Sequence, residues 1–371
     1  MNNQISRRNL IKLLGVSGMT LPLSSIAKPI EKRISKKIDR HSPIKLSSNE
    51  NPYGPSTNVR NAIVDAFDEA CRYPYNRVAE LESMIAKKEG VDPNMVLVTG
   101  GSNEALRATG RYYGIEKKEI IACKPTYLAL MTYAEDFGCK INWVPLDKDL
   151  KFDLNEIARR TTNNTSMVFI CNPNNPTGTM VGAKELEDFC ISTSKKTCVF
   201  VDEAYYDYSI MDGYPTMTKL VKKGHNIIVS RTFSKIYGLA GVRIGYIISS
   251  SETIANIKKC TMAGTNMLAT HAAIAAYSED EFFEYSLNKN KEGLKYLYGL
   301  FDELGLDYKE SKTNFVFFKT GHHIDKVAKF MKDKGVLIGR PFPPYYEWCR
   351  ISTGKIEDLK VFGEKLKEFY A

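Results

Sequence analysis

Short apolar runs alternate with stretches of helical period through the middle of the chain. Near-continuous apolar runs of this length are typical of strands buried on both faces. The expected strands are residues 95–99, 119–123, 140–144, 167–171, 198–201, 226–230 and 244–249. Residues 81–89 and 184–193 and the run from Ser102 are expected helices. This alternation predicts an α/β domain with a mostly parallel sheet sandwiched by helices.

The pattern changes after residue 250, where helical period dominates and strands become fewer. The elements expected there are helical stretches over residues 251–304, a closing helix over residues 356–370 and strands over residues 315–318 and 335–338. We therefore expect a large domain at residues 53–250 and a smaller α+β C-terminal domain at residues 251–371. Residues 28–52 are expected to form a leader or arm.

Composition places the chain among ordinary soluble globular proteins. Of its 371 residues, 43% are hydrophobic and 26% are charged, which excludes long disordered or collagen-like structure. It contains no run of about 18 or more uncharged apolar residues, so stable membrane insertion is not expected. The formal net charge is +9. No basic stripe with interleaved aromatic residues accompanies this excess, so nucleic-acid binding is not expected.

The N-terminus has the three regions of an export signal. Residues 1–27 hold no acidic residue, and Arg7 and Arg8 precede apolar residues and Lys12. Small residues at Ser25 and Ala27 suit cleavage after Ala27. The segment resembles a twin-arginine (Tat) signal, which predicts periplasmic or exported localisation through the Tat machinery. The alternative is a basic tail or a first amphipathic helix, which would leave the protein in the cytoplasm.

The cysteines give no sign of a metal site. The chain has eight of them and no C-x-x-C pair, so neither a zinc site nor a thioredoxin-type site is expected. Several lie in apolar runs, as Cys171 does, and a Tat substrate folds in the reducing cytoplasm before export. We expect mostly free, buried thiols.

Four motifs follow predicted strands. They are Thr99-Gly-Gly-Ser-Asn-Glu104, Cys171-Asn-Pro-Asn-Asn-Pro-Thr-Gly178, Val199-Phe-Val-Asp-Glu-Ala-Tyr205 and the run from Ser230 to Gly245 that contains Lys235 and Arg243. Ligands of parallel sheets bind beyond the carboxyl ends of the strands, so the four motifs predict one site. Each motif alone also has a structural explanation, such as a capped strand-to-helix turn or a proline-rich loop.

The residue types in these motifs suit an anionic ligand and a nucleophile. The helix that starts at Ser102 offers free N–H groups to an anion, and Arg243 can fork onto a phosphate. A buried carboxylate such as Asp202 requires a cation or hydrogen-bond donors. Lys235, among apolar residues, can lose its proton and act as a nucleophile.

Together these motifs resemble those of pyridoxal-phosphate (PLP) enzymes of fold type I, the aspartate aminotransferase superfamily. Residues 47–55 and 72–74 match the histidinol-phosphate aminotransferase subgroup. The resemblance runs from about residue 44 to the C-terminus. It implies fold type I, PLP as cofactor, and transfer of an amino group between an amino acid, or an amino-acid-like amine, and a 2-oxo acid.

The resemblance also implies residue roles. Lys235 would hold PLP as a Schiff base and then move the α-proton, and Asp202 would pair with the pyridinium nitrogen. Tyr205 and Asn175 would bind the 3′ oxygen of the ring. The cofactor phosphate would be bound by Gly101, Ser102, Thr232, Ser234 and Arg243.

Further positions are implied at the substrate end. Tyr127 would stack on the ring, or else be a core tyrosine. Tyr73 would reach the phosphate of a neighbouring subunit, which predicts a homodimer with shared sites. Arg350 would clamp the substrate carboxylate, and Asn49 would help to close the site. Arg340 would lie near a substrate phosphate, or else be a surface arginine.

Two other functions remain open at this stage. Relatives with the same motifs carry out decarboxylation or elimination, although a carboxylate clamp at Arg350 disfavours decarboxylation. A non-catalytic PLP-binding module is the other alternative, and the intact Lys235, Asp202 and Arg243 argue against it. The amino donor is also left open, because histidinol phosphate belongs to cytosolic histidine synthesis whereas the N-terminus predicts export.

Overall fold

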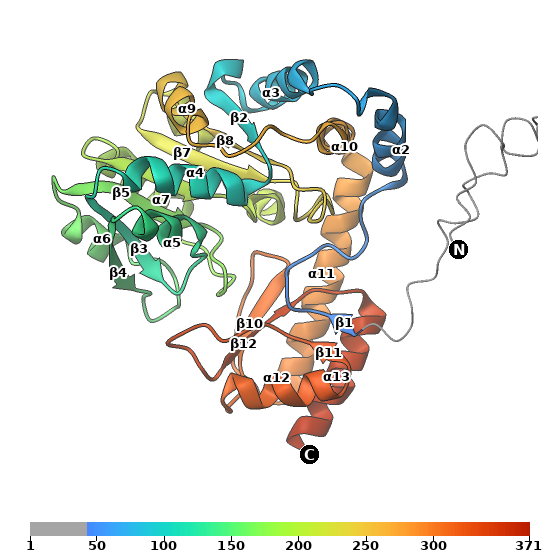
Figure 1. The fold of residues 1–371 in the computed structure, drawn as a ribbon. Coiled ribbons are helices and arrows are strands. Elements are labelled where there is room, and N and C mark those ends of the chain that lie inside the picture. The colour runs from blue at the N-terminus through green and yellow to red at the C-terminus, as the bar shows by residue number, and fades with distance from the viewer. Residues whose placement is uncertain (1–42) are drawn as a thin grey trace, which may run out of the picture. The chain divides into compact units, whose positions relative to one another are not determined.

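The computed structural model describes residues 43–371, and Figure 1 shows their arrangement. The predicted signal at residues 1–27 lies outside the described residues, as does most of the predicted leader. Within residues 43–371 no helix has the length and apolar character needed to cross a membrane. All eight cysteines fall in this part of the chain; none forms a disulfide, and all but Cys71 are buried.

A seven-stranded sheet forms the centre of the larger part, in the order β2-β8-β7-β6-β5-β3-β4. Its strands are β2 (Val96–Thr99), β3 (Glu119–Lys124), β4 (Lys140–Pro145), β5 (Thr165–Cys171), β6 (Cys198–Asp202), β7 (Ile227–Thr232) and β8 (Gly245–Ile248). The strands from β7 to β4 pair in parallel, which confirms the predicted mostly parallel α/β sheet. The exception is β8, which runs antiparallel to both of its neighbours. It returns beside β7 through a loop rather than through a crossover helix.

Helices cover both faces of this sheet. Every residue of β5, β6 and β7 is buried, which requires cover on each side. The helices of this part of the chain, not all of which touch the sheet, are α2 (Thr57–Asp65), α3 (Tyr75–Glu89), α4 (Ser102–Gly114), α5 (Ala129–Asp136), α6 (Leu154–Arg160), α7 (Ala183–Thr193), α8 (Thr218–Lys222), α9 (Ser251–Lys258) and α10 (Met267–Tyr277). Of these, α9 packs on α4 and β2, and α10 packs on α2 and α3.

A second hydrophobic core lies in the lower part of Figure 1. Its elements are α11 (Asp280–Glu303), α12 (Ile324–Asp333), α13 (Ile356–Tyr370), the antiparallel strands β9 (Tyr308–Lys309), β10 (Phe315–Lys319) and β12 (Trp348–Ser352), and the parallel pair β1 (Ile44–Lys45) and β11 (Val336–Leu337). Long α11 runs from the upper part to the lower part. The α+β character agrees with the sequence pattern, while the predicted boundary near residue 250 stays a prediction.

The helical stretches predicted over residues 251–304 are α9, α10 and α11. Polar side chains cap the first two of these helices at their N-termini. The Ser250 side chain accepts a hydrogen bond from the amide of Thr253, and the Asn266 side chain accepts one from Ala269.

The first described residues cross between the two cores. Strand β1 pairs with β11, and Leu46 is buried in the second core. Residues 46–52, which we term the crossing segment, then lead towards α2. Gly54 follows this segment and lies against Gly238, where a Cβ would stand 2.9 Å from the Gly238 Cα atom. Glycine at both positions permits this close approach.

Candidate active site

A cavity of about 300 Å³ lies where the predicted motifs converge. Its volume is at the lower end of the range for small-molecule sites. The predicted residues that line it are Asn49, Ser102, Tyr127, Asn175, Asp202, Tyr205, Thr232, Ser234, Lys235, Arg243, Arg340 and Arg350. Gly101 immediately precedes Ser102 at the start of α4. The structure thus brings together residues from the sheet edge, the crossing segment and β12.

Asp202 ends β6 at the base of this cavity. Its side chain is buried, and burial raises the pKa of the carboxyl group to about 6. Two hydrogen bonds oppose this shift: Ser230 Oγ donates to Asp202 Oδ1 over 2.6 Å, and the Ala204 amide donates to the same oxygen over 3.3 Å. A buried carboxylate of this kind favours a cationic ligand group.

Lys235 lines the same cavity. Burial lowers the pKa of its amine to about 8, and Arg350 adds to the effect, while Glu50 and Asp202 oppose it. Lys235 Nζ donates to the Asn49 carbonyl oxygen over 3.2 Å. A lowered pKa leaves a useful fraction of neutral amine near pH 7, as a nucleophile or proton acceptor requires.

Tyr205 is held by two amide groups. Its hydroxyl oxygen accepts from Asn49 Nδ2 over 2.9 Å and from Asn175 Nδ2 over 3.4 Å. Burial raises the pKa of Tyr205 above its usual range, so the phenol keeps its proton. Since both lone pairs meet donors, the hydroxyl hydrogen remains free to donate into the cavity.

Another part of the cavity lining forms an anion cradle. Gly101, with a φ of 90°, precedes the first amides of α4 and leaves room for Arg243, whose guanidinium would collide with a Cβ at that position. Arg243 Nη1 donates to Ser234 Oγ over 3.2 Å, and Thr232 Oγ1 accepts from the Ser234 amide over 3.1 Å. Helix N–H groups, hydroxyls and a guanidinium together suit a phosphate.

Arg350 reaches the cavity from β12. It is 8% exposed, and burial lowers the pKa of its guanidinium. Nη1 donates to Asn175 Oδ1 over 2.6 Å, and Nη2 donates to the Ser47 carbonyl oxygen over 2.5 Å. Within residues 43–371 no carboxylate forms an ion pair with it, so the charge is available to an anionic substrate.

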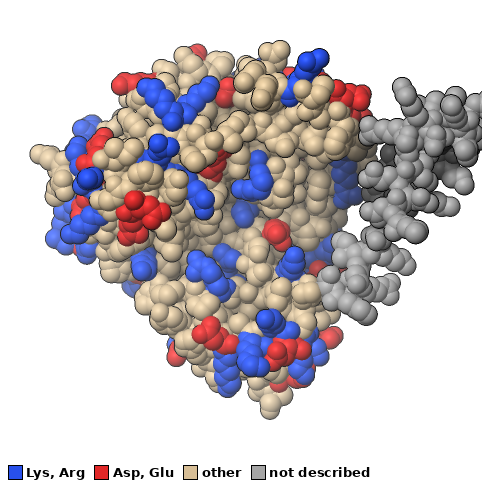
Figure 2. All heavy atoms as spheres, in the orientation of Figure 1, with Lys and Arg blue, Asp and Glu red and all other residues tan. Residues whose placement is uncertain are grey.

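Tyr127 and Arg340 stand at the mouth. The Tyr127 hydroxyl donates to Asn103 Oδ1 over 3.2 Å, which fixes the ring at the cavity wall. Arg340 is exposed, lies over the Phe342 ring at 4.5 Å and donates to the Pro341 carbonyl oxygen. Figure 2 shows more blue than red atoms around the hollow in the middle of the visible face.

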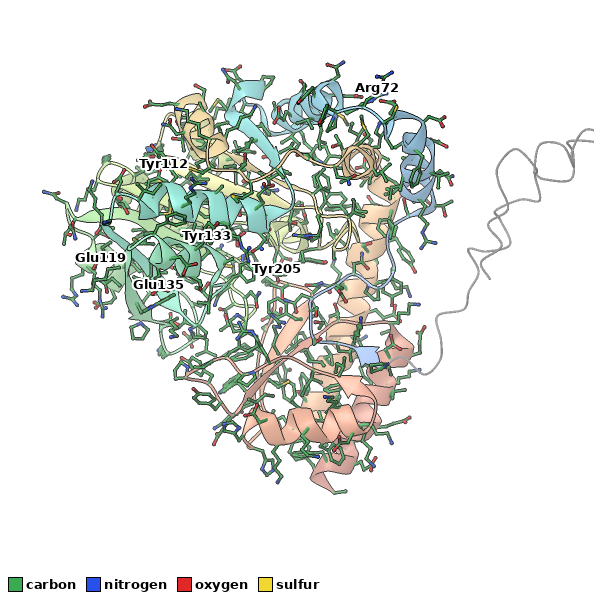
Figure 3. The ribbon with its side chains drawn as sticks, viewed as in Figure 1. Arg72, Tyr112, Glu119, Tyr133, Glu135 and Tyr205 are labelled. Atoms are coloured by element: carbon green, nitrogen blue, oxygen red, sulfur yellow. The ribbon has the colours of Figure 1, made fainter. Side chains whose placement is uncertain are left out.

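Tyr73 lies apart from the cavity of its own chain. It is 80% exposed and stacks on Tyr75 at 5.7 Å between ring centroids. Figure 3 labels the adjacent Arg72 at the outer edge of the upper part, far from Tyr205 at the centre. The role predicted for Tyr73 therefore requires a second subunit.

Two contributors to the site, Ser352 and Asn314, were not among the predicted residues. Ser352 Oγ donates to Asn49 Oδ1 over 3.0 Å and accepts from the Asn49 amide over 2.8 Å. Asn314 Nδ2 donates to the Asn49 carbonyl oxygen over 2.9 Å. Ser352 follows Arg350 at a spacing of two, which places both on one strand face and was the only available hint.

The residues fit pyridoxal phosphate. The carboxylate of Asp202 suits a protonated ring nitrogen, the anion cradle suits the phosphate, and Lys235 suits an aldehyde carbon; all of them line one cavity. When bound, the cofactor draws electron density away from the substrate carbon that loses its proton. Within residues 43–371 no cluster of three or more His, Cys, Asp or Glu residues is placed to hold a metal ion.

Comparisons with known proteins agree with this chemistry. Residues 41–366 match the model of the family described as aminotransferase class I and II. The chain is 35% identical to a histidinol-phosphate aminotransferase of Moorella thermoacetica over 348 residues, which cover 93% of this chain and 89% of that protein. It is also 35% identical to one from Caldicellulosiruptor saccharolyticus over 347 residues, covering 92% and 95% of the two chains.

Solved structures show the same fold. A putative histidinol-phosphate aminotransferase from Erwinia carotovora atroseptica superposes with a TM-score of 0.84 at 32% identity, covering 88% of this chain and 96% of that one. The Sinorhizobium meliloti histidinol-phosphate aminotransferase in complex with pyridoxal-5′-phosphate superposes with a TM-score of 0.80 at 24% identity, covering 96% and 100%. The chain thus belongs to the aminotransferase class I and II family and is a PLP-dependent aminotransferase of fold type I.

Proposed function

We propose that this aminotransferase takes an amino donor with an anionic group, a carboxylate or a phosphate, close to the carbon that bears the amine. The buried guanidinium of Arg350 carries the proposal. A cation held in a buried site strongly favours an anionic ligand over a neutral one. The amino group is then passed to a 2-oxo acid.

The relatives support histidinol phosphate as one candidate donor, because the similar proteins from Moorella and Caldicellulosiruptor are histidinol-phosphate aminotransferases. Arg340 at the mouth supports the same class of donor. A phosphate carries more negative charge than a carboxylate, and a second guanidinium can share it. The position of Arg340 suits a dianion better than a simple amino acid.

A donor screen tests this proposal. The purified holoenzyme is mixed with histidinol phosphate, histidinol, an aromatic amino acid or glutamate, and the cofactor absorbance is followed without an acceptor. We expect reaction with the anionic donors and little with histidinol, which has the same ring and amine but no anion. Equal rates with histidinol and its phosphate would refute the role of the anion. Arg340→Met should slow the phosphate donor more than the carboxylate donors.

We propose, further, that the enzyme works as a homodimer in which Tyr73 reaches the cofactor phosphate of the other subunit. Exposed apolar side chains near it in the sequence support a buried partner surface: Val64 is 58% exposed, Phe67 62% and Tyr75 74%. Mixed dimers provide the test. Lys235→Ala and Tyr73→Ala chains should each be nearly inactive alone but regain activity after joint refolding, because one site of the mixed dimer is intact. No recovery, or a monomeric mass in solution, would contradict shared sites.

We also propose that residues 1–27 direct export by the Tat machinery, to the periplasm or beyond. The paired Arg7 and Arg8, the apolar run and the small residues before the expected cleavage point support this. Residues 1–30 fused to a Tat-dependent reporter should export it, and Arg7→Lys with Arg8→Lys should abolish export. A reporter that stays in the cytoplasm in both cases would contradict the proposal.

A further inference from the structure

Ser230 is a fully buried serine that lies beside the acid at the base of the site. It belongs to β7, and the register of β6 and β7 pairs it directly with Asp202. Its hydroxyl does not line the cavity, so it cannot touch a ligand there. Instead, Ser230 Oγ donates to Asp202 Oδ1 over 2.6 Å, a length typical of a strong hydrogen bond to a carboxylate.

Both donors that reach the Asp202 side chain converge on one oxygen. The Ala204 amide also donates to Oδ1, over 3.3 Å. A carboxylate with one oxygen tied to two groups cannot rotate freely about its Cβ–Cγ bond. The other oxygen, Oδ2, receives no hydrogen bond from residues 43–371, and Asp202 lines the cavity. The arrangement therefore reserves Oδ2 for a ligand.

The residues that follow Asp202 and Ser230, Glu203 and Arg231, form an ion pair instead. Arg231 and Glu203 each follow a member of the first pair by one residue, so they point to the opposite face of the sheet. Arg231 Nε donates to Glu203 Oε2 over 2.7 Å, and both side chains are buried. The acid that faces the cavity is thus paired with a neutral hydroxyl, whereas the acid behind it is paired with a cation. A cation beside Asp202 would have neutralised the charge that a pyridinium requires.

We propose that Ser230 is a positioning residue that holds Asp202 so that Oδ2 meets the protonated ring nitrogen of the cofactor. Its hydrogen bond fixes the carboxylate and stabilises its ionised form without cancelling its charge. The inference rests on the pairing of Asp202 with that nitrogen, so the test separates the two ideas.

The test measures cofactor affinity rather than turnover. The full-length apoenzyme is titrated with pyridoxal phosphate and with its 1-deaza analogue, in which carbon replaces the ring nitrogen. Ser230→Ala should weaken binding of pyridoxal phosphate about tenfold, the ratio expected for a hydrogen bond to a charged group. Binding of the analogue should be unchanged, because it has no ring nitrogen for Asp202 to meet.

Three further variants guard the interpretation. Ser249→Ala removes another buried hydroxyl, which donates to the Ile227 carbonyl oxygen over 2.8 Å, and should leave both affinities unchanged. Ser230→Cys keeps a side chain of similar size with a weaker hydrogen-bond donor. It should also weaken binding of pyridoxal phosphate more than binding of the 1-deaza analogue, so it can replace Ser230→Ala if that variant does not fold. Asp202→Ala should show the largest difference between its loss of affinity for pyridoxal phosphate and its loss of affinity for the 1-deaza analogue.

The possible results distinguish the role of Ser230 from that of Asp202. Unchanged binding in Ser230→Ala and Ser230→Cys, or an equal loss for both ligands, would overturn the positioning role while leaving that of Asp202 intact. If Asp202→Ala weakens both ligands equally, the pairing with the ring nitrogen fails, and the inference for Ser230 fails with it.

Discussion

Replacing Asn49 with alanine should remove the side-chain hydrogen bonds that connect the crossing segment to Tyr205 and Ser352. The Asn49 side chain donates to the Tyr205 hydroxyl over 2.9 Å and accepts from Ser352 Oγ over 3.0 Å, so one amide bridges the larger and the smaller part. Its backbone is left-handed, with a φ of 55°. Asparagine tolerates this conformation better than alanine does.

The magnitude follows from these contacts. Each of the two hydrogen bonds contributes about 1 kcal/mol. A left-handed alanine costs about 1–2 kcal/mol more, so Asn49→Ala should lose about 3–4 kcal/mol of the free energy of unfolding. Asn49→Gly removes the same hydrogen bonds without the backbone strain, although the unfolded chain gains freedom worth about 0.4–1 kcal/mol. We therefore expect Asn49→Gly to be more stable than Asn49→Ala, by up to about 1.6 kcal/mol.

Urea unfolding of the apoenzyme, followed by tryptophan fluorescence, gives the stability. Steady-state kinetics of both variants complete the experiment. Since both polar groups of the Asn49 side chain are occupied by protein, kcat should fall while KM for the donor changes little. A glycine variant less stable than the alanine variant would refute the strain argument. A large rise in KM with kcat unchanged would instead show that Asn49 binds the substrate itself.

Three other predictions concern single side chains. Arg231→Met leaves Glu203, whose side chain is 3% exposed, without its cation and should lower the free energy of unfolding by about 3–5 kcal/mol. Lys184→Ala breaks an exposed ion pair and should change the urea midpoint far less, so equal midpoints for the two variants would contradict this reasoning. Arg350→Lys should raise KM for anionic donors about tenfold or more, because an ammonium cannot fork onto a carboxylate, and an unchanged KM would remove that role. Cofactor uptake by the apoenzyme should quicken as pH rises to about 8, where the lowered pKa of Lys235 frees its amine, and then level off; a rise that continues towards 10.5 would show an unperturbed lysine.

Local sequence patterns were enough to predict the strand-borne part of the site. Asp202 ends an apolar strand and Lys235 follows another, and parallel strands bring their carboxyl ends to one edge. The direction of β8 was not predictable in the same way, since an apolar run reads identically in either direction. Its antiparallel pairing depends on the loop after Thr232, which turns back instead of forming a crossover helix.

Contacts between residues far apart in the chain could not be predicted from local sequence patterns. The bond between Asn49 and Ser352 joins positions 303 residues apart, and no local period encodes such a pairing. Ser230 was visible within a motif, but its partner depends on strand register. A shift of one residue would have placed Arg231 beside Asp202 and changed the charge of the site.

The crossing segment also limits how the gene can be divided. Strand β1 pairs with β11, and Leu46 is buried in the second core. The C-terminal part of the chain therefore needs residues 44–46 to complete its fold. A fragment that begins at α11 would expose the edge of β11 and an apolar hollow shaped for Leu46. Such a fragment should be poorly soluble when expressed alone and should recover when a peptide of residues 43–52 is supplied. Fusions or permutations that keep this peptide joined to the fragment are accordingly the better design for studying the smaller part in isolation.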